Sequence, residues 1–139
     1  MSTKENKILV QRYWEEVWNQ GNLVLIDEFF APPLIDGQKY FISRTLQAFS
    51  DSRVTIEDMI AEGDKVVVRY SWQATHTSVW DITLSNLAMN IAPTSKQVWD
   101  RGIAIFRIAD GKIVENWSEW TKLELAQQLG VVPTAEGGE

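Results

Sequence analysis

The stretch IAIFRIADGKIVENWSEW, residues 103–120, has the pattern of two strands joined by a tight turn. Apolar and polar side chains alternate on either side of Asp110-Gly111, and an Asp-Gly pair between such runs is a strong signal for a hairpin turn. We therefore predict an antiparallel hairpin with strands over about 96–108 and 112–120.

The same period of two extends upstream as far as Arg53. A turn is expected at Glu62-Gly63-Asp64, and the strand after it presents one apolar face. The segment 79–91, which ends before Pro93, is less regular. The apolar face of the strand is formed by Val66, Val68, Tyr70 and Trp72, and Ala74 and His76 continue it if no bulge intervenes.

The first third of the chain is helical instead. Ser2 and Glu5 have the spacing of a capping box, which predicts a helix over about 3–19. A second helix is expected between Asn22 and Pro32-Pro33.

Two further helices are expected, over about 38–49 and over 122–129. The last is capped by Thr121 and ended by Gly130. Helices followed by antiparallel strands define an α+β protein. A curved sheet wrapped around the long N-terminal helix would form a cone with an apolar interior. We expect a single domain over 1–130 and a flexible tail over 131–139.

Composition excludes several classes of function. The 139 residues carry a net charge of −6, which argues against electrostatic binding of nucleic acid or anionic membranes. There is no cysteine, and His76 is the single histidine, so we expect no metal site. No apolar run reaches the roughly 20 residues of a membrane span, and the N-terminus lacks a signal core, which predicts a cytoplasmic protein.

Several segments together resemble the SnoaL-like polyketide cyclases, within the superfamily of nuclear transport factor 2 and ketosteroid isomerase. Their order and spacing carry the resemblance over most of residues 8–130. The segments are RYWEEVWNQGNLVLIDEFFAP, DSRVTIEDMIAEGDKVVVRYSWQATHT, APTSKQV, IAIFRIADGKIVENWSEW and LAQQLG.

The resemblance implies a cystatin-like α+β barrel with a cone-shaped cavity, a homodimer, and acid–base chemistry on a hydrophobic small molecule. The chain departs from the family pattern in two places. It lacks the Asp-His pair expected after the second helix. Ser118 and Thr121 stand where the last strand of the family carries two acids.

Similarity to ketosteroid isomerase relates three positions of this chain to functional residues of that enzyme. Tyr13 matches the tyrosine that stabilises an oxyanion, Asp36 falls near the catalytic base, and Ala104 replaces a second acid. If Ala104 faces the cavity, strand alternation turns Asp100, Gly102 and Phe106 inward as well.

Asp100 is therefore the main candidate acid, because an apolar pocket raises the pKa of a carboxyl group toward neutrality. Gly102 and Ala104 beside it would leave room for a ligand. The alternative is a solvated acid at the mouth of the cone. Tyr13 and His76 have structural alternatives as core residues, and Asp36 as half of an Asp-Gly turn.

The cavity walls and the outer sheet face follow from the same alternation. Tryptophan is frequent, with seven in the chain. On the convex face, Trp99, Ile103, Ile105 and Trp117 form a patch too apolar for solvent, which predicts a homodimer. The expected substrate contacts are Trp14, Tyr70, Trp72, Phe106, Asn116, Ser118 and Trp120.

The resulting hypothesis is a cofactor-independent cyclase or isomerase. Asp100 would transfer protons, Tyr13 would polarise an oxygen, and the cavity would hold a hydrophobic natural-product intermediate. Two alternatives remain open: a non-catalytic small-molecule-binding protein of the same fold, and an epoxide-opening hydrolase or cyclase.

Overall fold

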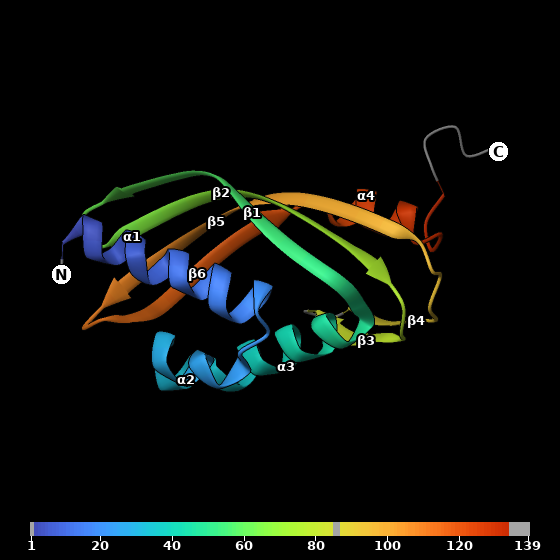
Figure 1. The fold of residues 1–139 in the computed structure, drawn as a ribbon, viewed down its shortest axis with the longest axis horizontal. Coiled ribbons are helices and arrows are strands. Elements are labelled where there is room, and N and C mark those ends of the chain that lie inside the picture. The colour runs from blue at the N-terminus through green and yellow to red at the C-terminus, as the bar shows by residue number, and fades with distance from the viewer. Residues whose placement is uncertain (1, 85–86, 134–139) are drawn as a thin grey trace.

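The computed structural model describes residues 2–84 and 87–133 and shows a curved sheet folded over a layer of helices (Figure 1). The helical elements are α1 (Thr3–Arg12), its π-helical continuation η1 (Tyr13–Asn19), η2 (Leu23–Leu25), α2 (Ile26–Phe29), α3 (Pro32–Ala48) and α4 (Lys122–Gln128). The strands are β1 (Phe49–Glu62), β2 (Lys65–His76), β3 (Trp80–Leu84), β4 (Leu87–Ile91), β5 (Gln97–Ala109) and β6 (Lys112–Trp120).

The main sheet has four strands in the order β1-β2-β5-β6, and each neighbouring pair is antiparallel. Asp110 and Gly111 have φ of 51° and 74°, the two positive values that a tight β5–β6 turn requires. The predicted hairpin and the α+β class are both confirmed.

The register of β2 against β5 runs without a bulge from Lys65 to Thr75. Alternate residues of β2, from Val66 to His76, are therefore buried along one face. The prediction that alternate residues of this strand face the interior is therefore confirmed as far as His76.

The first helix begins with the predicted capping box, in which Ser2 and Glu5 exchange side-chain and backbone hydrogen bonds. Its second half widens into the π-helix η1. That change brings Tyr13, Trp14 and Trp18 onto the buried side together, and all three face the concave side of the sheet.

One helix boundary and one helix cap differ from the prediction. Helix α3 begins at Pro32 instead of at about residue 38, because proline suits the first helical position, where its missing N–H needs no partner. Asp36 and Gly37 therefore lie inside a helix and not in a turn. Thr121 precedes α4 without capping it, since its Oγ1 accepts a hydrogen bond from the Arg101 N–H of β5 at 3.1 Å.

The irregular segment 79–91 forms a separate hairpin of β3 and β4. Trp80 Nε1 donates to Thr45 Oγ1 at 3.2 Å, and Arg44 Nη1 donates to the Asp81 carbonyl at 2.9 Å, so α3 holds the hairpin in place. The hairpin closes the sheet at the end opposite the N-terminus (Figure 1).

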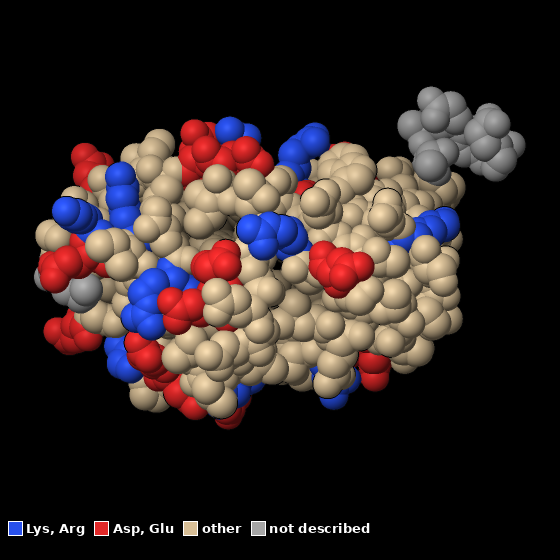
Figure 2. Space-filling view, in the orientation of Figure 1, with Lys and Arg blue, Asp and Glu red and all other residues tan. Residues whose placement is uncertain are grey.

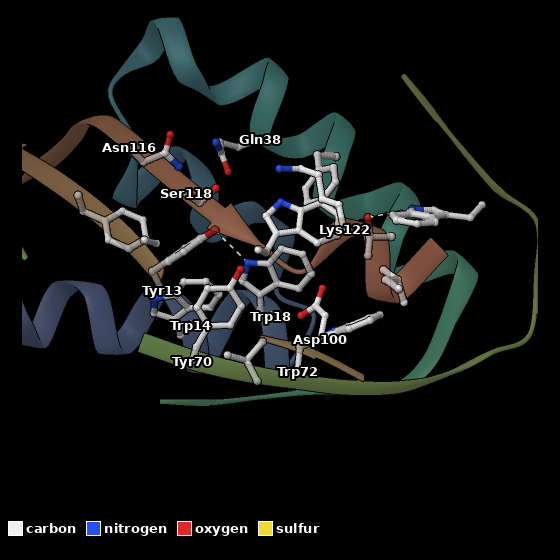
Figure 3. Close-up of a pocket in the computed structure, with 18 residues that line it drawn as sticks. Tyr13, Trp14, Trp18, Gln38, Tyr70, Trp72, Asp100, Asn116, Ser118 and Lys122 are labelled. Atoms are coloured by element: carbon white, nitrogen blue, oxygen red, sulfur yellow. Dashed lines mark hydrogen bonds between the residues drawn. The ribbon is translucent and has the colours of Figure 1, made fainter. Parts of the chain in front are cut away.

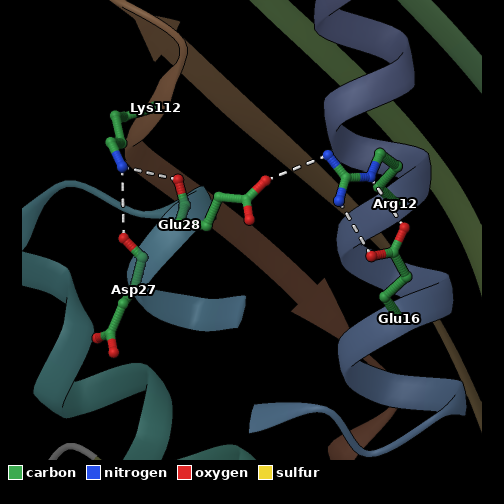
Figure 4. Close-up of polar contacts among 5 residues, drawn as sticks. All are labelled: Arg12, Glu16, Asp27, Glu28 and Lys112. Atoms are coloured by element: carbon green, nitrogen blue, oxygen red, sulfur yellow. Dashed lines mark hydrogen bonds and ion pairs between the residues drawn. The ribbon is translucent and has the colours of Figure 1, made fainter. Parts of the chain in front are cut away.

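The other end is fastened by polar contacts among α1, α2 and β6 (Figure 4). Arg12 binds Glu16 at 2.9 Å and Glu28 at 3.2 Å, and Lys112 Nζ donates to the Glu28 carbonyl at 2.8 Å. Charged side chains of both signs intermingle over this end of the molecule, whereas the opposite end carries few (Figure 2).

Within residues 2–84 and 87–133, no helix has the length and apolar character needed to cross a bilayer. Gly130 has φ of 80° and follows the end of α4, as predicted. Of the expected tail, residues 134–139 lie outside the described part of the chain.

Candidate active site

A cavity of about 340 Å³ lies between the concave face of the sheet and the helices (Figure 3). Half of the lining residues are aromatic. The main sheet supplies one side of the cavity, and η1, α3, α4 and the start of β3 supply the rest. The lining residues are Tyr13, Trp14, Trp18, Gln38, Phe41, Thr45, Val54, Tyr70, Trp72, Trp80, Asp100, Ala104, Phe106, Asn116, Ser118, Trp120, Lys122 and Leu125.

Asp100 sits on β5 opposite Trp72 of β2, and its side chain points into this cavity. Only 6% of its surface is exposed, and its Oδ1 has no hydrogen-bond partner among the described residues. Burial raises the pKa of the Asp100 carboxyl to about 7, because the apolar walls disfavour the charged form. The carboxyl is thus placed by strand parity and poised to gain or lose a proton near neutral pH.

Tyr13 lies on η1 with its ring centre 5.8 Å from that of Phe106 on β5, and its hydroxyl accepts a hydrogen bond from Trp18 Nε1 at 2.9 Å (Figure 3). Burial raises the pKa of Tyr13 far above neutrality, so the hydroxyl keeps its proton. Since the oxygen already accepts a bond from Trp18, the hydroxyl proton remains available to a ligand oxygen.

The space above Gly102, which the sequence suggested would be open to a ligand, is occupied by Tyr70. A Cβ at position 102 would lie 2.7 Å from the Tyr70 hydroxyl oxygen and 2.6 Å from the Glu119 carbonyl. Ala104 does line the cavity. Burial and the neighbouring Asp100 both raise the pKa of Tyr70, so this hydroxyl is also protonated.

The aromatic rings form a continuous wall. The Trp14 ring lies 4.8 Å from Tyr70 and 6.3 Å from Trp18, measured between ring centres. Trp72 is fixed by an Nε1–H bond to Ser52 Oγ at 2.8 Å. Rings held this rigidly offer flat surfaces on which an unsaturated ligand can stack.

Polar side chains gather at one end of the cavity: Gln38, Asn116, Ser118 and Lys122 (Figure 3). Ser118 and Lys122 are exposed, and Gln38 and Asn116 are half-buried, so this end is the mouth. The inward positions of Asn116, Ser118 and Trp120 agree with the strand alternation. Gln38 and Lys122 were missed, because sequence periodicity shows which face of a helix is apolar but not which polar residue borders a cavity.

Trp18 and Trp80 were also missed as lining residues. Trp18 was expected in a helix, but the sequence carries no signal for the π-helical geometry that brings it beside Tyr13. Trp80 falls in the segment with no clear period.

Asp36 and His76 lie outside the cavity lining. Asp36 is exposed on α3, because the helix begins earlier than expected and turns this residue toward solvent. His76 is fully buried against Phe49, with ring centres 4.9 Å apart. His76 Nδ1 accepts a hydrogen bond from the Thr94 N–H at 3.2 Å. Burial lowers the pKa of His76, so the ring is neutral and joins the end of β2 to the segment that contains Thr94.

Asp100 is the single acidic residue among the described lining residues. No group of three or more His, Cys, Asp or Glu side chains with metal-binding proximity occurs in residues 2–84 and 87–133. The polar groups of the described lining include one carboxyl group, the Lys122 ammonium group, phenol hydroxyls, and amide and hydroxyl groups.

The structure is thus a curved antiparallel sheet over helices, with a cavity between them that holds one buried acid. The SnoaL-like polyketide cyclase family matches residues 8–129, and the chain belongs to this family. Among curated proteins, none matches the sequence.

Solved structures with the same fold cover nearly the whole chain. AclR, described as a putative hydroxylase from Streptomyces galilaeus, has 24% identity and a TM-score of 0.80 over 96% of this chain and 86% of its own. TsrD from Streptomyces laurentii has 22% identity and a TM-score of 0.79 over 95% and 99%. A putative polyketide cyclase from Acidithiobacillus ferrooxidans has 26% identity and a TM-score of 0.74 over 94% and 98%.

Proposed function

We propose that the protein is a cofactor-independent cyclase or isomerase that acts by proton transfer on a hydrophobic, polyketide-like intermediate. The observation that carries this proposal is the Asp100 carboxyl, which is buried in an aromatic cavity and has one oxygen without a hydrogen-bond partner in the described part of the chain. Membership of the cyclase family supports the reaction class.

In this mechanism the protonated Asp100 gives its proton to the substrate as a ring closes or a double bond moves. The resulting carboxylate then takes a proton from another position of the substrate, so the net reaction is an isomerisation. The Tyr13 hydroxyl donates a hydrogen bond to the carbonyl oxygen on which negative charge develops. The aromatic walls hold a flexible chain in the reactive conformation, which contributes by orientation alone.

The base form of Asp100 can be tested without knowledge of the natural substrate. Ring opening of 5-nitrobenzisoxazole needs only a base that removes one carbon-bound proton in an apolar pocket. We expect a rate that rises with pH around a midpoint of about 7 and falls at least about 100-fold in Asp100→Asn.

Asp110→Asn is the matched control for this experiment. It makes the same change at the exposed β5–β6 turn, where asparagine tolerates the positive φ. An unchanged rate in Asp100→Asn, or a profile without the midpoint, would reject the acid–base role.

A second candidate is a small-molecule-binding protein without catalysis. The observation that favours it is the lack of a second acid among the described lining residues, with Ser118 in the cavity at the position where the family resemblance implies an acid. The same observation argues against epoxide opening, which needs acids that hold or activate water. Ligand binding that persists in Asp100→Asn, with no conversion by the wild-type protein, would establish the binding function.

A further inference from the structure

Lys122 is the only charged side chain besides Asp100 that lines the cavity within the described residues. It begins α4, and its Nζ lies 4.9 Å from the centre of the Trp120 ring. No carboxylate of the described chain lies within ion-pair distance of this Nζ, whereas Lys39 pairs with Asp27 at 3.0 Å. A cation at the rim of a cavity, without an acidic partner, is available to a ligand.

Three uncharged polar side chains surround the same end of the cavity. Gln38 comes from α3, and Asn116 and Ser118 come from β6, so Lys122 and its neighbours converge from separate elements (Figure 3). None of these side chains makes a hydrogen bond to another described residue, so the amide and hydroxyl groups can turn their donors toward a ligand oxygen.

The interior of the cavity has no comparable place for an anion. Its walls are aromatic, and Asp100 would repel a negative charge when ionised. Ser118 lies opposite Ala104, four residues along β5 from Asp100, which corresponds to roughly 13 Å along the strand. One ligand can therefore meet Asp100 with its inner part and the polar side chains around Ser118 with its outer end.

We propose that Lys122 makes this cavity selective for acidic ligands. A flat unsaturated body lies against the tryptophan rings, while Lys122, assisted by Ser118 and Gln38, holds a carboxylate at the mouth. The proposal deepens the proposed function by naming the ligand class. It does not depend on proton transfer by Asp100.

The opposite selectivity is the main competitor. Aromatic rings together with one carboxylate can also bind an organic cation, through the ring faces and the negative charge. Lys122 disfavours this occupant, because its ammonium group would face a second positive charge at the mouth.

The test compares three two-ring probes of nearly equal size by titration calorimetry: 2-naphthoate, its methyl ester and 2-naphthylmethylammonium. At a pH of about 6, where Asp100 is mostly protonated, we expect the wild-type protein to bind the carboxylate at least about tenfold more tightly than the ester. This preference should decrease as salt is added.

Lys122→Met keeps a long apolar chain against Trp120 but removes the charge. We expect it to lose the carboxylate preference while it binds the ester as before, and Lys122→Arg to restore it. Lys65→Met, at the distant β1–β2 turn where Lys65 lies 3.6 Å from Asp64, is the matched control and should keep the preference.

Equal affinity of the wild-type protein for acid and ester would overturn the proposal, as would a preference for the ammonium probe or an acid preference that survives in Lys122→Met. Failure of all three probes to bind would overturn it too. Measurements on Asp100→Asn separate the two proposals: a retained acid preference together with an unchanged ring-opening rate supports Lys122 selectivity and rejects only the proton-transfer role.

Discussion

At the scale of single residues, Asp100 shows how burial changes the ionisation of a carboxyl group. Its carboxyl lies among indole and phenol rings with no cation of the described residues paired to it, so burial dominates its ionisation. A site that retains such a group accepts a cost in folding stability, because the ionised form must lose its water without compensation.

This cost predicts an unusual dependence of stability on pH. The Asp100 pKa is about 7 in the folded protein and near 4 in the unfolded chain, so the unfolded chain releases the proton first as pH rises. The Asp100 contribution to stability is therefore complete below pH 4 and is lost between about pH 4 and 7, by up to about 4 kcal/mol.

Asp100→Asn should remove this dependence. Urea unfolding at pH 5 and pH 8 should show a smaller loss of stability with pH in the variant than in the wild-type protein, and a more stable variant at pH 8. Parallel stability curves for the two proteins would contradict a raised pKa at this position. Asp110→Asn serves again as the control.

At the scale of elements, the predictable parts are those with a repeating pattern. Strand alternation in β2 and β5 is enough to place Asp100, Tyr70 and Phe106 on the concave side, and Asp110-Gly111 is enough to place the hairpin. The start of α3 and the β3–β4 hairpin were not predicted. Proline both ends one helix and begins the next, and a two-stranded hairpin docked on a helix has no period of its own.

The candidate site was predictable to the same extent. Its sheet side follows from parity, whereas its helix side depends on how α3 and η1 pack, which single-sequence periodicity cannot supply. Gln38 and Lys122 become site residues only through that packing. The prediction of open space above Gly102 was wrong for a related reason, because the Tyr70 side chain fills that space.

At Gly102 of β5, the neighbouring strand β6 leaves no room for a side chain. An alanine Cβ there would lie 2.6 Å from the Glu119 carbonyl and 2.9 Å from Trp120 Cβ, so the backbone of β6 would have to move. We expect Gly102→Ala to destabilise the protein by about 1–3 kcal/mol, measured by urea unfolding, and to weaken ligand binding because Trp120 shifts.

Gly37→Ala is the matched control, with the opposite expected sign. Gly37 lies inside α3, and no atom lies within 4 Å of the position that an added methyl group would take. Alanine should therefore stabilise the helix by about 0.5–1 kcal/mol. If Gly102→Ala were as stable as the wild-type protein, the close approach of the two strands would be contradicted.

At the scale of the whole molecule, the two faces of the sheet have different surroundings. The concave face builds the cavity, and the convex face still exposes large apolar side chains. Trp99, Ile103 and Trp117 retain 44%, 50% and 46% of their surface in the single chain. Arg69 and Glu119 lie on either side of Ile103 in the register, so positive and negative groups flank the apolar centre.

This distribution favours a symmetric dimer through the convex face. In a two-fold interface each patch meets a copy of itself, so the Arg69 side of one protomer can face the Glu119 side of its partner while the apolar side chains lose their contact with water.

We expect the protein to sediment as a dimer at micromolar concentration. Ile103→Glu places an unpaired charge at the centre of the interface and should shift it to monomer, with at least about a tenfold weaker association. Val24→Glu, on a side chain that is 71% exposed in η2 on the helical layer, should leave the dimer intact. A wild-type monomer throughout the accessible concentration range, or a dimer that withstands Ile103→Glu, would show that the apolar convex face is not the interface.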